Sequence, residues 1–202
     1  MMSNYVARQD HRRCVVIWFV ALGLLATNVV AAADSRDTTI VMTTTRDTIE
    51  LTVPVSALAL RIPKGDLAAV EESRTGAQGS PRYFHLADAG RGLVISGWIE
   101  SAKTFRGFET FWAGEFSAMK RSGLIPTASP MPVAVGNWSG AAYEIPLPGG
   151  AGEIVNTHIR AELIKAGTWI DLHISITSRK PLADARSEAL EFLKSIVVNE
   201  KG

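Results

Sequence analysis

The segment from residue 154 to residue 177 alternates between hydrophobic and polar positions more regularly than any other part of the chain. A period of two is typical of a β-strand with one buried face. The alternation breaks at Lys165-Ala166-Gly167, where glycine favours a turn. The pattern therefore predicts a long antiparallel hairpin with one apolar face. We expect the buried face of this hairpin to contain Ile159, Ala161, Leu172 and Ile174.

Two other stretches have the spacing of helices. Apolar residues, most of them aromatic, recur at steps of three and four between residues 103 and 121, before Gly123. An aromatic stripe at this spacing is more typical of a core face than of a ligand pocket. Residues 181–198 are also amphipathic, and we predict a second helix there. The aromatic stripe consists of Phe105, Phe108, Phe111, Trp112 and Phe116.

Most of the remaining chain consists of runs of strand-forming residues, and each run is bounded by glycine or proline. Residues 66–73 fit either a short helix or an irregular strand. Strand pairs joined by short turns, with helices between the pairs, predict an α+β fold, an antiparallel β-sheet with helices packed on it. The predicted strands outside the long hairpin span residues 48–53, 55–62, 82–88, 92–100, 131–138 and 141–146.

The first 33 residues have a different pattern, with a basic start, an apolar run over 15–26 and Ala31-Ala32-Ala33 at the end. This is typical of a secretory signal peptide cleaved after Ala33, which predicts a periplasmic or secreted protein. The alternative is an uncleaved membrane anchor, but Thr27 and Asn28 interrupt the apolar stretch. Polar residues 34–47 then predict a flexible lead-in, and residues 48–202 a single α+β domain.

Composition narrows the classes of function. The chain has 202 residues, of which 47% are hydrophobic and 20% charged, and this composition excludes intrinsic disorder. A net charge of +1 gives little attraction for nucleic acid, so we expect no nucleic-acid partner. The single cysteine, Cys14, excludes an intrachain disulfide and a site made of several thiolates.

The order of the predicted elements resembles the Mog1/PsbP-like fold, including its exported bacterial DcrB-type members. Strand pairs lead into a central helix, the hairpin 154–177 follows, and an apolar end-helix over 189–198 closes the domain. The likeness covers residues 51–198. Members of this family are mostly non-enzymatic accessory, adaptor or binding proteins. The resemblance therefore implies a binding or accessory role and supplies no catalytic residues.

His158 and His173 lie on the polar face of the predicted hairpin. A turn centred on residues 165–166 would place them opposite each other, whereas one centred on 166–167 would place His173 opposite Arg160. Zinc would accept two histidines together with Asp171 or Glu162. Because Arg160 would repel a cation, we expect a solvated polar face, and neither a metal site nor a cofactor.

Trp169 shares this face, and beside Arg160 and His173 it would suit a ligand- or partner-binding surface. Alternatively a helix covers the face and buries Trp169, which is the favoured alternative because two helices have to be placed. Ser117 and Lys120 match the S-x-x-K pattern of serine nucleophiles without its companion motifs, so we predict an ordinary helix surface and no catalytic residues. The candidate binding residues are Trp169, Arg160, His173 and His158.

These observations favour an exported, non-enzymatic accessory or binding protein of the cell envelope. Its expected partner is an unknown protein or a small apolar ligand, and it contacts a membrane only if the signal segment stays attached. The alternatives are a periplasmic hydrolase and a ligand or stress sensor that uses a cleft between helix and sheet.

Export gives the first testable prediction. The mature protein should begin at Asp34, because Ala31 and Ala33 supply the small residues that signal peptidase requires. N-terminal sequencing of protein purified from the cell envelope measures this directly. An intact N-terminus in the membrane fraction would show an anchor instead.

Overall fold

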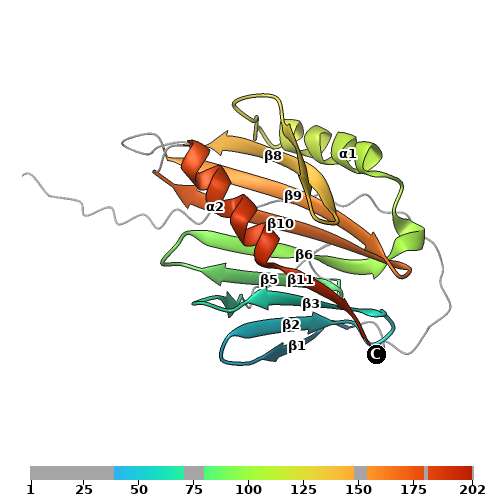
Figure 1. Cartoon of the computed structure of the whole chain (residues 1–202). Helices are drawn as coiled ribbons and strands as arrows, with labels where there is room; N and C mark the ends of the chain where they lie inside the picture. Colours follow the sequence, from blue (N-terminus) through green and yellow to red (C-terminus); the bar gives the residue numbers. More distant parts are fainter. Residues whose placement is uncertain (1–38, 71–79, 148–153, 180–181, 202) are drawn as a thin grey trace, which may run out of the picture.

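The computed structural model describes residues 39–70, 80–147, 154–179 and 182–201. Within these residues the chain forms two antiparallel β-sheets and two α-helices, which confirms the predicted α+β class (Figure 1). The predicted signal peptide and its cleavage site lie outside the described residues. The elements are β1 Val41–Thr44, β2 Thr48–Thr52, β3 Leu58–Pro63, β4 Ala68–Ala69, β5 Tyr83–Asp88, β6 Leu93–Ser101, the 3-10 helix η3 Ala102–Thr104, α1 Phe108–Arg121, β7 Met131–Val135, β8 Trp138–Pro146, β9 Val155–Lys165, β10 Thr168–Ser178, α2 Leu182–Ser195 and β11 Val197–Glu200.

The predicted hairpin is the centre of the larger sheet. Seven strands lie in the order β4-β5-β6-β10-β9-β8-β7, so β9 and β10 have neighbours on both sides. Ala166 (φ 46°) and Gly167 (φ 72°) form the turn, and Lys165 pairs with Thr168. This is the second of the two turns that the sequence allowed. It places His173 opposite Arg160.

The smaller sheet has the order β1-β2-β3-β11. Two of the sequence-based expectations about its strands are wrong. The second helix ends at Ser195, and Val197–Glu200 pairs as β11 with β3 instead of continuing the helix to residue 198. Consecutive β-branched residues at 196–198 favour a strand there. The expected flexible lead-in contains β1, which pairs with β2 although its four residues are exposed. In residues 66–73, Ala68–Ala69 forms the short strand β4, and residues 71–73 lie outside the described part.

One continuous apolar core joins both sheets to α2. It includes Leu51 and Leu60 of the smaller sheet and Leu193 of α2, each fully buried. The predicted buried face of the hairpin belongs to this core, because Ile159, Ala161, Leu172 and Ile174 have no exposed surface. Figure 1 shows α2 and β11 lying across this face of the larger sheet. The predicted burial of these four residues is therefore confirmed.

Helix α1 covers part of the opposite face of the larger sheet. It begins after Gly107 (φ 97°) and ends before Gly123 (φ 71°), where left-handed backbone favours glycine. The predicted helix started at residue 103, but residues 102–104 form η3 and α1 begins at Phe108. Met119 of α1 packs with Tyr143 and Ile145 of β8 in a second, smaller apolar cluster. Among the described residues, no helix has the length and apolar character needed to cross a membrane.

Candidate functional site

The polar face of the β9–β10 hairpin is buried. Strand alternation brings His158, Arg160 and Glu162 of β9 to the same face as Asp171 and His173 of β10. The exposed fraction is 1% for His158, 8% for Arg160, 3% for Glu162 and 2% for Asp171. The expected solvated face is therefore wrong. Aromatic side chains cover this face, and we call its five polar residues the polar cluster.

The aromatic cover comes from α1, the segment before it and the neighbouring strands. The guanidinium carbon of Arg160 lies 5.0 Å from the ring centroid of Phe111 on α1 and 5.5 Å from that of Trp98 on β6. Trp169 is half-buried, with ring centroids 5.2 Å from Phe105 and 6.0 Å from Phe111. Phe111 of the predicted aromatic stripe thus packs on Arg160, and Phe105 and Phe111 cover Trp169 in part without burying it in the core.

Arg160 and Asp171 form a buried ion pair. The Arg160 Nη2 atom donates a hydrogen bond to Asp171 Oδ2 at 2.7 Å. Burial raises the pKa of Asp171 to about 6, although Arg160 opposes this shift. Burial lowers the pKa of Arg160, but the surrounding acidic groups, with Asp171 and Glu115 the largest contributors, together raise it by more, so this guanidinium stays charged. The charged guanidinium of Arg160 thus lies beneath α1 with Asp171 as its counter-charge.

The two histidines contact each other. His158 Nδ1 and His173 Nε2 share a hydrogen bond of 2.9 Å, and Tyr143 stacks on His158 with ring centroids 4.9 Å apart. Burial and the nearby Arg160 lower the pKa of His158 to about 3, and burial also lowers that of His173. Both rings are therefore neutral at pH 7. No group of three His, Cys, Asp or Glu residues in the described part of the chain is arranged to hold a metal ion.

Glu162 and Asp171 lie opposite each other in the hairpin register. Trp169 Nε1 donates a hydrogen bond to Glu162 Oε2, whereas Glu162 Oε1 and Asp171 Oδ1 are buried without a hydrogen-bond donor among the described residues. Burial and the Asp171 charge raise the pKa of Glu162 to about 9. The sequence indicated that these carboxyl groups share a face, but gave no sign of their burial.

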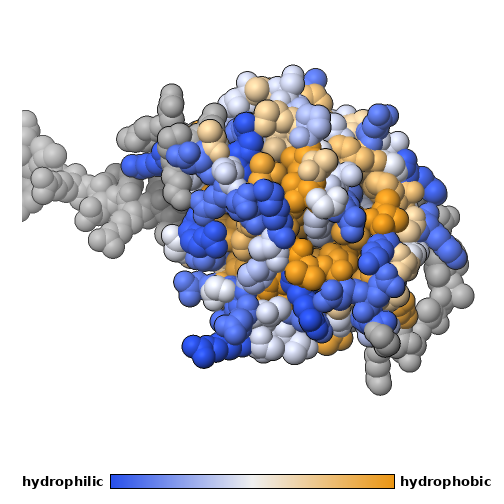
Figure 2. Space-filling view, viewed as in Figure 1, coloured by the Kyte–Doolittle hydropathy of each residue, from blue (hydrophilic) through white to orange (hydrophobic). Residues whose placement is uncertain are grey.

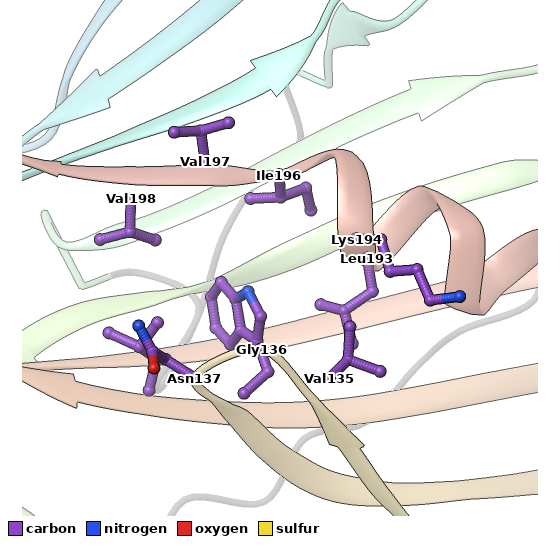
Figure 3. Close-up of a pocket in the computed structure, with 10 residues that line it drawn as sticks. Val135, Gly136, Asn137, Leu193, Lys194, Ile196, Val197 and Val198 are labelled. Carbon is purple, nitrogen blue, oxygen red and sulfur yellow. The ribbon is translucent and has the colours of Figure 1, made fainter.

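A separate apolar groove lies on the opposite face of the larger sheet, between β11, the end of α2 and the β7–β8 turn. Figure 2 shows hydrophobic residues gathered on this side of the molecule. The groove has a volume of about 340 Å³. In Figure 3, Val198 extends from β11 toward the side of Asn137, whereas Val197 extends away from it. The lining consists of Val135, Gly136, Asn137, Trp138, Leu163, Leu193, Lys194, Ile196, Val197 and Val198.

The groove could not be predicted from the sequence because its walls come from three segments that are distant along the chain. The available signal was the Gly136-Asn137 turn, where the positive φ of Gly136 (58°) favours glycine and closes the β7–β8 hairpin that forms one wall of the groove. Of the predicted candidate residues, Arg160, His173 and His158 lie in the polar cluster instead, and Trp169 lies beside it, bonded to Glu162.

The S-x-x-K pair does not form a nucleophile and base. Ser117 Oγ donates its hydrogen bond to the carbonyl of Ala113 at 2.8 Å, and the Lys120 ammonium lies 4.8 Å from the ring centroid of Phe116. Both residues are exposed on α1. The structure therefore places this motif on an ordinary helix surface.

Comparison with known proteins gives little further information. No family model and no curated protein matches the chain. A crystal structure of a protein from Bacteroides thetaiotaomicron is similar with a TM-score of 0.40 and 10% sequence identity, over 72% of this chain and 46% of that chain. The chain thus spans less than half the length of that protein, and the similarity is too low to assign a common fold.

The Arg160–Asp171 ion pair gives the second testable prediction. Arg160→Met should lower the free energy of unfolding by roughly 3–5 kcal/mol at pH 7, because it leaves a buried carboxylate without its cation. Urea unfolding followed by circular dichroism measures the loss.

The matched control is Arg61→Met, which removes the partner of Glu50 in an ion pair whose arginine side chain is 53% exposed. This control should cost at most about 1 kcal/mol. Equal losses in the two variants would contradict the burial of the polar cluster.

Proposed function

We propose that this protein is an exported, non-enzymatic accessory or binding protein of the cell envelope that holds a small apolar ligand in the groove beside β11. The observation that carries the proposal is the groove itself. Its volume of about 340 Å³ falls at the lower end of the range of small-molecule sites, and its walls are mainly aliphatic and aromatic. Such sites typically contain a few polar groups that orient the ligand, a role that Asn137 would fill here.

The chemistry of the groove favours an uncharged ligand. Lys194 is the charged residue of the lining, but its ammonium forms an ion pair with Glu191 at 2.5 Å. Trp138 and Leu163 belong to the apolar part of the lining, and both are buried. A flat or branched apolar molecule with one hydrogen-bonding group would match this set of side chains.

The polar cluster favours binding over hydrolysis as the activity of this chain. Arg160 is hydrogen-bonded to Asp171, and His158 to His173, so the polar atoms in these bonds are engaged within the fold. Arg160 and His158 are buried beneath the rings of Phe111 and Tyr143, and His173 is half-buried. The four predicted binding candidates therefore support the fold in this conformation. A periplasmic hydrolase, and a sensor that uses a helix–sheet cleft, remain the alternatives.

The cellular setting of the proposal comes from the sequence. The signal-peptide pattern of residues 1–33 supports export to the periplasm or secretion, with a membrane anchor as the alternative. The order of elements supports a Mog1/PsbP-like relationship, whose members are mostly accessory or binding proteins. Both remain proposals.

Ligand binding gives the third testable prediction. The uncharged fluorophore N-phenyl-1-naphthylamine should bind the protein saturably at a ratio of one to one, with an increase in its fluorescence. Val198→Glu should weaken this binding at least about tenfold, because a carboxylate in the apolar groove has to be desolvated.

Ile164→Glu is the matched control, since Ile164 is 51% exposed on β9 and outside the groove lining. It should bind the fluorophore like the wild type. Binding that is not saturable, or that Val198→Glu leaves unchanged, would contradict the proposed site. Circular dichroism of both variants checks that they fold.

A further inference from the structure

The buried carboxyl groups of Glu162 and Asp171 carry an inference that is independent of the groove. Each group has one oxygen with an identified donor, which is Trp169 Nε1 for Glu162 and Arg160 Nη2 for Asp171. Their other oxygens, Glu162 Oε1 and Asp171 Oδ1, are buried and receive no hydrogen bond from an amide, guanidinium, indole or hydroxyl donor in the described residues. Two such atoms on directly opposed residues call for a physical explanation.

A single proton explains both atoms. Two ionised carboxylates cannot lie side by side in a buried site at low cost, whereas a carboxylic acid can donate its O–H to a neighbouring carboxylate. We propose that Glu162 is the acid and donates to Asp171 Oδ1, and that this shared proton is a latch that keeps α1 closed over the sheet. With Glu162 neutral, the charge of Asp171 is balanced by Arg160.

The latch acts through the charges that face α1. Removal of the proton would leave two carboxylates against the single guanidinium of Arg160. Glu115 on α1 faces the same cluster and interacts electrostatically with both Arg160 and Asp171. Deprotonation of Glu162 would therefore add a negative charge on the side of the sheet that faces Glu115 of α1, and would weaken the aromatic cover. The other titratable groups around the site are His158 on β9, His173 on β10, Tyr143 on β8 and His85 on β5.

The pKa values define the pH window of the latch. Burial raises the pKa of Glu162 from 4.5 to about 9, so the folded protein binds this proton more tightly than the unfolded chain does, and stability falls as pH rises through the interval between these values. The Asp171 interval, from 3.8 to about 6, lies lower. The pKa of each histidine is lowered below 6.5, and that of Tyr143 is raised above 10. Between pH 7 and pH 9 Glu162 is therefore the group in the cluster that titrates.

The fourth testable prediction compares the wild type with Glu162→Gln. The glutamine amide can donate to Asp171 Oδ1, and its carbonyl can accept from Trp169 Nε1, so this variant keeps both hydrogen bonds without a titrating proton. In urea unfolding the folding equilibrium constant of the wild type should fall about tenfold per unit between pH 7 and pH 9, and that of Glu162→Gln should stay constant. Glu50→Gln, which removes an acid from the smaller sheet, should keep the wild-type dependence.

Amide hydrogen exchange tests whether the proton acts on α1. After correction for the intrinsic effect of pH, protection of α1 in the wild type should decrease more than that of β9 and β10 between pH 7 and pH 9, and Glu162→Gln should show no such difference. Equal loss across these elements, or loss retained in Glu162→Gln, would overturn the latch. If the variant fails to fold, infrared spectroscopy of the wild type decides: a protonated carboxyl band at pH 7 that disappears above pH 9 supports the shared proton, and its absence at pH 7 overturns it.

Discussion

The structure depends on the burial of the polar face of the β9–β10 hairpin. The strands β9 and β10 lie in the middle of the larger sheet, and both faces of the sheet are covered there. Only one of these two faces is apolar. Burial of an unpartnered charge costs many kcal/mol, so groups on the second face have to find partners among themselves. Arg160 pairs with Asp171, His158 with His173, and Glu162 with Trp169. Aromatic rings of α1 then close the site, because they can pack on a guanidinium without competing for its hydrogen bonds.

The two faces of the larger sheet therefore differ: polar residues are buried beneath α1 on one face, and an apolar groove lies beside the core on the other. The residues that would attract attention as catalytic or binding groups are engaged beneath α1. The opposite face of the sheet is covered incompletely, since α2 ends at Ser195 and β11 turns away to join β3, and the groove lies where they separate. A binding role in the groove and a structural, proton-dependent role in the polar cluster are therefore compatible within one domain.

The elements that follow from local periodicity could be predicted from the sequence, whereas the features that depend on contacts between distant segments could not. Alternation along 154–177 identified the hairpin and the residues on each face, but a period of two is the same whether the polar face meets water or the rings of Phe105 and Phe111. The turn was left open because Ala166 adopts a positive φ that usually belongs to glycine. The amphipathic pattern of α2 runs without a break into β11, so pairing with β3 decides where the helix ends. The groove combines segments that no periodicity connects.

The most direct test of this account is the titration of the Glu162 side-chain carboxyl by nuclear magnetic resonance, with assignment from Glu162→Gln. This carboxyl lies in a buried site beside Asp171, and burial and the Asp171 charge raise its pKa to about 9. We therefore expect Glu162 to be protonated at pH 7 and to lose its proton in the alkaline range. A transition near the ordinary value of 4.5 would show that the group is ionised and solvated, and would contradict the buried polar face on which the structure depends.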